Sequence, residues 1–218
     1  MSTRSDLSVE GVRLAVWAAT DTGEASYNCF VNESHLQYLA SPEWAHTLET
    51  DLLPWVESAG PLGDHVLEIG PGPGLTTDLL RHRVSRVTAV EIDLSLGRAL
   101  QTRLADTNVE VVVGDATKVG LPADHFSAAA CFSVLHHMAS ADEQDRLFVE
   151  LHRVLRPGAI FVGQESLDLE MIRAGHADDT FTAVDPEDLS VRLAAVGFEP
   201  LTTDVLGYHF RFVTRKAG

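Results

Sequence analysis

The sequence predicts an α/β protein in which a largely parallel sheet is covered by helices on both faces. Strand-like and helix-like patterns alternate between residues 65 and 198, and such alternation is typical of βαβ units. Several strands are continuous apolar runs, such as AIFVG at 159–163, which indicates burial on both faces. The 218 residues are enough for one domain with a core and a short appendage.

A helical segment is predicted before the first strand, over residues 33–59. Its apolar side chains recur at three- and four-residue steps. Ser41 and Pro42 fit the cap and first position of a helix. We therefore divide the chain into an N-terminal helical segment, residues 1–61, and a second unit, residues 62–218.

The elements of the second unit follow from periodicity, caps and turns. Asp185 followed by Pro186 predicts a helix start, and the run Arg-Pro-Gly at 156–158 predicts a helix stop. Strands are predicted at 65–69, 86–92, 109–113, 126–134, 159–165, 199–206 and 208–215, with helices at 75–83, 94–105, 142–155 and 185–198.

The first strand runs into a glycine-rich turn, VLEIGPGPG at 66–74. Glycines let the backbone approach a ligand, and the following helix aims its N–H groups at it. The spacing is G-x-G-x-G, because Leu75 or Thr77 stands where the dinucleotide pattern requires its third glycine. A nicotinamide-dependent oxidoreductase is therefore disfavoured, and no Gly-Lys-Ser/Thr follows to indicate a P-loop.

Acidic side chains end the next two predicted strands. Glu91 can accept hydrogen bonds from both hydroxyls of a ribose, and Asp115 can accept one from an amino group such as that of adenine. Open α/β sheets bind ligands at the carboxyl ends of their strands. These residues therefore indicate a ligand site at that edge.

These motifs together resemble the class I S-adenosylmethionine-dependent methyltransferases. VLEIGPGPG, AVEIDLS, VVGDAT, LPADHFSAAACFSVLHHM and LHRVLRPGAIFVGQE follow one another as in that family, over about residues 62–215. The resemblance implies a doubly wound, Rossmann-like sheet of seven strands, the last one antiparallel, with an N-terminal helical lid. It looks closest to the branch that methylates small molecules.

The resemblance also implies a site for S-adenosylmethionine, which leaves as S-adenosylhomocysteine. The glycine loop would pass under the methionine and ribose parts, Glu68 would organise the amino-acid end, and Tyr27 would contact the cofactor from the lid. The implied cofactor-binding residues are Tyr27, Glu68, Gly70, Pro71, Gly72, Gly74, Glu91, Ile92, Asp115, Ala116, Phe132 and Ser133.

Methyl transfer needs alignment above all, and a general base only where the acceptor must lose a proton. His136 and His137 follow the fourth strand and are the candidate bases, because imidazole titrates near neutrality. We expect no metal site, since His176, Asp178 and Asp179 read as a solvated polar loop.

The net charge of the chain helps to indicate which class of molecule accepts the methyl group. With 16 Lys and Arg against 32 Asp and Glu, the formal charge is −16, which disfavours a nucleic-acid partner. AVEID is similar to the ribosomal RNA adenine dimethylases, but their Asn-Leu-Pro-aromatic motif is replaced here by CFSVLHH. We expect a small aromatic or lipophilic acceptor, methylated on oxygen or nitrogen. The alternatives are a peptide or protein methyltransferase and a non-catalytic S-adenosylmethionine-binding partner subunit.

The compartment is predicted from what the sequence does not contain. No apolar run approaches the ~18 residues of a membrane-spanning helix, and MSTRSDLSVEG has no apolar signal core. Cys29 and Cys131 form no CxxC pair. We expect a cytoplasmic protein without membrane partners, as a monomer or homodimer.

Overall fold

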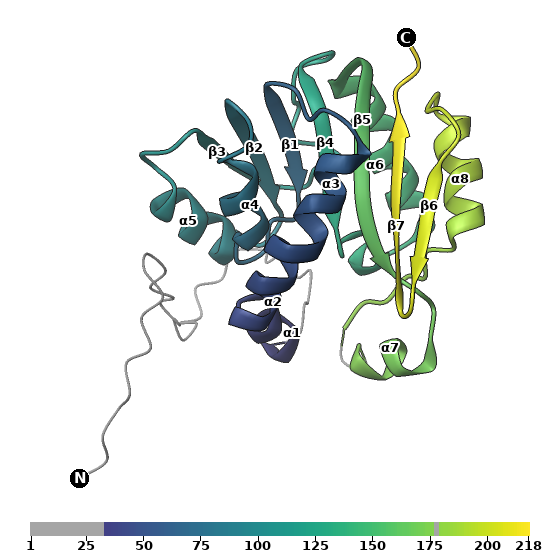
Figure 1. Ribbon diagram of the computed structural model, residues 1–218, viewed down its shortest axis with the longest axis horizontal. Helices are drawn as coiled ribbons and strands as arrows, with labels where there is room; N and C mark the ends of the chain where they lie inside the picture. The colour runs from purple at the N-terminus through teal and green to yellow at the C-terminus, as the bar shows by residue number, and fades with distance from the viewer. Residues whose placement is uncertain (1–32, 177–178) are drawn as a thin grey trace.

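A computed structural model describes residues 33–176 and 179–218. Tyr27, the expected lid contact, lies outside the described residues. The described part contains a seven-stranded sheet (Figure 1). Its strands are β1 (His65–Ile69), β2 (Arg86–Glu91), β3 (Val109–Val113), β4 (Phe126–Phe132), β5 (Leu155–Ser166), β6 (Thr202–Leu206) and β7 (His209–Arg215).

The strand order is β3-β2-β1-β4-β5-β7-β6. Strands β1 to β5 pair in parallel, whereas β7 runs antiparallel to both β5 and β6. The expected doubly wound sheet with an antiparallel last strand is therefore confirmed. The order reverses between β1 and β4, and such a switch point opens a crevice at the carboxyl ends of the strands.

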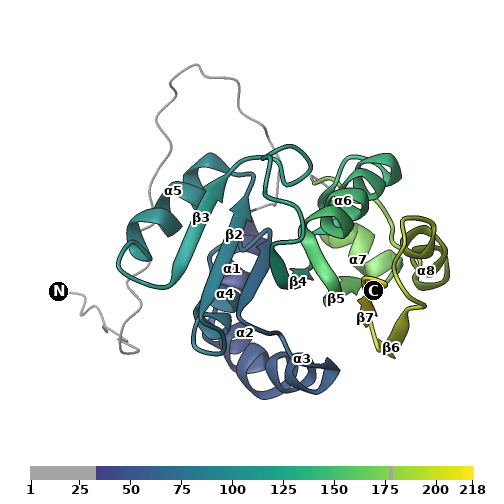
Figure 2. The same cartoon turned by 90° about the horizontal axis from the view of Figure 1, so that it is seen from above.

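Helices cover both faces of this sheet. They are α1 (Glu33–Leu39), α2 (Pro42–Thr47), α3 (Leu53–Ala59), α4 (Leu75–Leu80), α5 (Leu94–Arg103), α6 (Ala141–Val154), α7 (Glu170–Gly175) and α8 (Pro186–Ala195), with a π-helical turn at Leu48–Leu52 and a 3-10 turn at Leu135–His137. Figure 2 shows α3 and α6 on opposite sides of the sheet. Among the described residues, no helix is long and apolar enough to cross a membrane.

Alternation along each strand produces two separate cores. Leu67 and Ile69 of β1 pack with α6 and α8, in a cluster that also holds Cys131. Val66 of β1 points to the other face, where it packs with the π-helical turn, α3 and α4. Because successive side chains of a strand point to opposite faces, β1 contributes to both cores and is buried along its whole length.

The helical segment predicted over residues 33–59 consists of several short helices. It breaks after α1, where Ser41 caps α2 by accepting a hydrogen bond from the backbone N–H of Trp44 at 3.1 Å. Pro42 then occupies the first turn, as expected. The π-helical turn that follows places Leu48 and Leu52 in the core.

The structure corrects several predicted boundaries after residue 62. Strand β4 ends at Phe132 rather than 134, because Ser133 adopts a left-handed backbone (φ 57°) and a 3-10 turn follows. Strand β5 begins at Leu155 rather than 159, since Leu155 is already extended and pairs with Phe126. Helix α7 was not predicted, and the short helix after the glycine loop ends at Leu80.

The predicted cap of α8 is confirmed and gives a stability test. The Asp185 carboxylate accepts hydrogen bonds from the N–H groups of Glu187 and Asp188 at 2.9 and 3.0 Å. Because alanine leaves these donors without the cap, Asp185→Ala is expected to lower the free energy of unfolding by about 1 kcal/mol. Urea unfolding measures the loss, and Asp185→Asn, which keeps a capping oxygen, should lose less. Equal losses in both variants would contradict the capping role.

Strand β6 forms the outer edge of the sheet. All five of its residues are exposed, and its inner side pairs only with β7 among the described strands. Asp204, in the middle of the strand, accepts a hydrogen bond from the indole N–H of Trp55 at 3.3 Å.

Candidate functional site

Three adjoining cavities lie at the carboxyl ends of the strands. The glycine-loop cavity, of about 120 Å³, lies beside β1 and β2. The β3-side cavity, of about 320 Å³, shares Gly70, Ile92 and His137 with it. The β7-side cavity, also of about 320 Å³, shares Leu39, Trp44 and Ser133 with the glycine-loop cavity. The three cavities are therefore neighbours, and together they are called the crevice.

The glycine loop leaves an open floor in this crevice. Gly72 has a left-handed backbone (φ 54°), and a Cβ atom placed on it would have no described atom within 4 Å. Gly70 and Pro71 line the same cavity. Gly74 does not, because it stands at the start of α4 where a Cβ atom would come within 2.4 Å of Leu100. Gly72 therefore offers the space for a ligand, and Gly74 serves helix packing.

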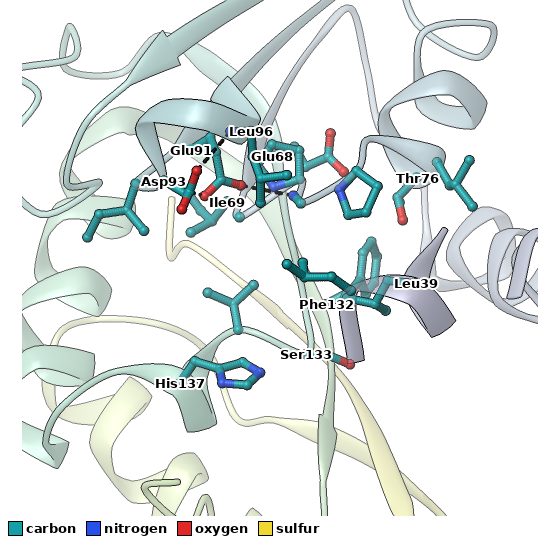
Figure 3. A pocket seen from close by; sticks show the side chains of 18 of the residues that line it. Leu39, Glu68, Ile69, Thr76, Glu91, Asp93, Leu96, Phe132, Ser133 and His137 are labelled. Atoms are coloured by element: carbon teal, nitrogen blue, oxygen red, sulfur yellow. Dashed lines mark hydrogen bonds between the residues drawn. The ribbon is translucent and has the colours of Figure 1, made fainter. Parts of the chain in front are cut away.

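Glu91 is fixed at the end of β2 by the loops on either side (Figure 3). Its two carboxylate oxygens accept hydrogen bonds from the N–H groups of Gly72 and Asp93, each at 2.9 Å. Burial raises the pKa of Glu91, although these hydrogen bonds oppose the shift. Each oxygen keeps a further lone pair, so the carboxylate can still accept two hydrogen bonds from a ligand in the cavity.

Glu68 lies deeper, one residue before the end of β1. It is 2% exposed and accepts a hydrogen bond from the hydroxyl of Thr77 at 2.6 Å. Burial raises the pKa of Glu68 to about 7, and the neighbouring carboxylates of Asp78 and Glu91 add to the shift. Because Glu68 also lines the cavity, a cationic group of a ligand could compensate its charge.

Asp115 follows β3 and lines the β3-side cavity with Ala116. Its carboxylate accepts hydrogen bonds from the backbone and hydroxyl of Thr117 and from Lys118. Burial, the largest contribution, raises its pKa, but these hydrogen bonds together outweigh burial and leave the pKa below its usual value. The Asp115 carboxylate is therefore held in place and charged, and it can accept a hydrogen bond from a ligand in the β3-side cavity.

Comparisons with known proteins give similarity in part of the sequence and in the fold. Residues 67–163 match the protein family described as "Methyltransferase domain". A solved S-adenosylmethionine-dependent methyltransferase of Archaeoglobus fulgidus superposes with a TM-score of 0.71 at 13% identity, over 85% of this chain and 100% of that one.

Residues 67–163 are therefore similar to a methyltransferase domain, and the chain has the fold of the solved Archaeoglobus fulgidus methyltransferase. Sequence relatives match parts of the chain. An uncharacterized methyltransferase of Mycobacterium bovis is 34% identical over 96 residues, which are 44% of this chain and 48% of that protein. A probable ribosomal RNA small subunit methyltransferase A of Thermococcus onnurineus is 48% identical over 59 residues, 27% of this chain and 22% of that protein. The chain thus matches about a fifth of the ribosomal RNA relative and about half of the mycobacterial one.

The predicted residues at the end of β4 and just after it separate into two groups. Phe132, Ser133 and His137 line the glycine-loop cavity, and Figure 3 shows His137 across the cavity from Glu91. His136 is missing from the described lining of all three cavities and is 0% exposed. Its Nδ1 atom lies 2.5 Å from a carboxylate oxygen of Glu165. Only His137 of the pair can therefore touch a ligand in the crevice.

Ser133 joins β4 to the crevice under backbone strain. It is one of two non-glycine residues with positive φ in the described chain, and such conformations cost about 1–3 kcal/mol and gather at functional sites. Its N–H donates to the carbonyl of Gln164 at 2.7 Å. This hydrogen bond holds the left-handed turn, which directs the chain after β4 along the crevice.

The crevice also has lining residues that are not among the cofactor-binding and catalytic residues predicted from the sequence. Leu36, Leu39 and Trp44 reach the glycine-loop cavity from the N-terminal helices. The β7-side cavity is lined from across the chain by Tyr38, Asp51, Gln164, Met171, Tyr208, His209 and Arg211, among others. Helical periodicity predicts the apolar face of the N-terminal helices. The lining of the β7-side cavity could not be predicted from local sequence patterns. It depends on distant segments, since antiparallel pairing of β5 with β7 brings Gln164 and Arg211 together.

Proposed function

We propose that the protein transfers a methyl group from S-adenosylmethionine to a small acceptor in the β7-side cavity. One observation carries the proposal: Glu68, Glu91 and Asp115 end three neighbouring strands and line one crevice, whose floor is open at Gly72. The bound cofactor supplies a methyl group that is already activated by its sulfonium. The chain then has to bind, orient and exclude water.

The cofactor would lie along the glycine-loop and β3-side cavities. Glu91 would accept hydrogen bonds from the ribose hydroxyls, and Asp115 would accept one from the adenine amino group. The charge of Glu68 would be compensated by the ammonium group of the methionine part. The other cavity-lining residues in this proposal are Gly70, Pro71, Gly72, Ile92, Ala116, Phe132 and Ser133. Gly74 would support the loop from outside the cavity.

The acceptor cavity supports the expectation of a small, partly aromatic substrate. Tyr38, Trp44 and Tyr208 line it, and cavities of about 300 Å³ or more hold small molecules. Both ring nitrogens of His209 are buried and have no hydrogen-bond partner among the described residues. His209 would therefore recognise a polar group of the acceptor. The charge of −16 favours a small molecule over the RNA suggested by the partial ribosomal RNA relative.

We also propose that the segment up to residue 61 acts as a lid over the crevice. Leu36, Leu39 and Trp44 cover the crevice from α1 and α2, and Figure 1 shows α1 below the carboxyl-terminal edge of the sheet. The segment within residues 1–61 would exclude water from the reacting groups, and residues 62–218 would hold the cofactor.

Calorimetric titration with S-adenosylhomocysteine, with NAD in parallel, tests the cofactor first. Micromolar or tighter binding of S-adenosylhomocysteine alone is expected. Methyl acceptance is then measured with metabolite extracts, ribosomal RNA and a basic peptide as separate acceptors. Labelling in the metabolite arm supports the proposal, and labelling confined to RNA or peptide contradicts it. Cofactor binding without labelling in any arm would favour a non-catalytic subunit.

Of the two candidate general bases, only His137 remains in this proposal, because His136 does not line any of the three cavities. His137→Ala is expected to lower turnover at least tenfold and to change S-adenosylhomocysteine affinity less than threefold. Steady-state kinetics with the identified acceptor and calorimetry check the two values. The matched control is His82→Ala, since His82 is exposed and does not line any of the three cavities. Full turnover in His137→Ala would leave alignment as the whole mechanism.

A further inference from the structure

Three buried histidines meet beside the crevice. His136 and His137 lie in the 3-10 turn after β4, and His176 follows α7. They are 0%, 6% and 9% exposed, and one ring nitrogen from each lies within 4.8 Å of the others. The sequence-based expectation that residues 176–179 form a solvated loop is therefore wrong for His176. It is also wrong for Asp179, whose side chain is buried.

The surroundings orient these rings as the surroundings of a metal site do. The Nδ1 atom of His136 lies 2.5 Å from the carboxylate of Glu165, and the Nδ1–H of His176 donates to the carbonyl of Ile172 at 2.7 Å. Metal-binding histidines characteristically donate one ring N–H to a carboxylate or carbonyl, which leaves the other nitrogen for the metal. The Nε2 atom of His136 is buried and has no hydrogen-bond partner among the described residues.

The charges around the cluster favour a cation. Glu165 is 0% exposed, and the side chain of Asp179 is buried with an oxygen 3.4 Å from Nδ1 of His137. Burying charge is costly, and the N–H groups of Val134 and Leu135, which donate to Glu165, offset part of that cost. A divalent ion held by neutral imidazoles would balance both carboxylates.

We propose that His136, His137 and His176 bind a divalent transition-metal ion of the zinc class. Imidazole nitrogen suits zinc, cobalt and nickel. A tetrahedral zinc site places its nitrogens about 3.4 Å apart, so the rings must approach one another by up to about 1.4 Å from the present separation of at most 4.8 Å. Three protein ligands with one open position is the coordination of catalytic zinc sites.

The histidine cluster lies beside the cavities, so the open coordination position could be taken by a ligand. His137 lines the glycine-loop and β3-side cavities, and His176 lines the β7-side cavity. The ion would thus lie where the proposed cofactor and acceptor cavities meet, and could coordinate an oxygen, nitrogen or sulfur atom of the acceptor. His137 would then act as a ligand rather than as a free base. This site goes beyond methyl transfer, and metal binding can be measured without turnover.

The test uses the full chain without a histidine tag, freed of metal with a chelator and titrated with Zn²⁺ by calorimetry. One ion per chain is expected, with micromolar or tighter affinity, and Co²⁺ should produce the visible absorption of a tetrahedral site. His176→Gln is expected to weaken Zn²⁺ binding at least 100-fold. The control His82→Gln, which removes an exposed imidazole, should leave affinity unchanged.

Two outcomes would overturn the site. One is wild-type protein that binds S-adenosylhomocysteine but takes up no Zn²⁺ or Co²⁺, a result that leaves the proposed function intact. The other is equal Zn²⁺ affinity in His176→Gln and His82→Gln. If His176→Gln fails to fold, Asp179→Asn replaces it, with an expected 10–100-fold loss of affinity because the partner of His137 loses its charge. Unchanged affinity in that variant would likewise contradict the site.

Discussion

Glu68→Gln is expected to stabilise the protein against unfolding above pH 7 by up to about 3 kcal/mol. Burial raises the pKa of Glu68 to about 7 from an ordinary value of 4.5, and each pKa unit corresponds to about 1.4 kcal/mol. Glutamine keeps an oxygen for the Thr77 hydroxyl but carries no charge to bury.

The pH dependence of this effect has a definite sign. Between pH 4.5 and 7 the folded protein keeps the Glu68 proton and the unfolded chain loses it, so the free energy of unfolding falls as pH rises. The variant lacks this loss, and its advantage should be small at pH 5 and full at pH 8. Urea unfolding at both pH values measures it. The exposed Glu49→Gln is the control, and an equal gain at pH 5 and pH 8 would contradict the explanation.

Glu91→Ala is expected to weaken S-adenosylhomocysteine binding by about 1–3 kcal/mol, which is about 5- to 150-fold. The change removes a charged acceptor for the ribose hydroxyls. It also releases the N–H groups of Gly72 and Asp93, which Glu91 holds at 2.9 Å, so the glycine loop loses part of its support. Calorimetric titration of the wild type and variant measures the loss.

A matched variant separates the two contributions of Glu91. Glu91→Gln keeps hydrogen-bonding oxygen but loses the charge, so its affinity should fall between those of the wild type and Glu91→Ala. Glu110→Ala removes an exposed carboxylate from the neighbouring strand β3, where it pairs with Arg86, and should leave affinity unchanged. Wild-type affinity in Glu91→Ala would place the ribose elsewhere.

The sequence predicted the parts of the fold whose causes are local. Alternation of strand and helix patterns, the caps at Ser41 and Asp185, and glycines that terminate β1 are properties of short segments, and all of them are observed. The place of the three acidic residues could also be predicted, because Glu68, Glu91 and Asp115 each lie at or just after the end of a predicted strand, and parallel strands end at one edge.

The remaining features depend on contacts between distant segments. Nothing near His176 in sequence indicates that it packs against His136 and His137, since the contact requires the chain after β5 to fold back over the turn after β4. The burial of Arg211 likewise depends on Gln164 and on Asp51 of the π-helical turn, which hydrogen-bond its guanidinium. Local patterns describe such residues as polar and therefore exposed.

The open edge at β6 makes the colloidal behaviour of this protein depend on its charge. Val205 and Leu206 are 61% and 41% exposed there, and an unprotected edge can pair with the edge of another copy. The carboxylate of Asp204 in mid-strand and the net charge of −16 both oppose such pairing. Near the isoelectric point of about 4.8 the net repulsion between copies vanishes. Acidification toward this pH should therefore reduce solubility, because charge repulsion no longer opposes pairing between the β6 edges of two copies.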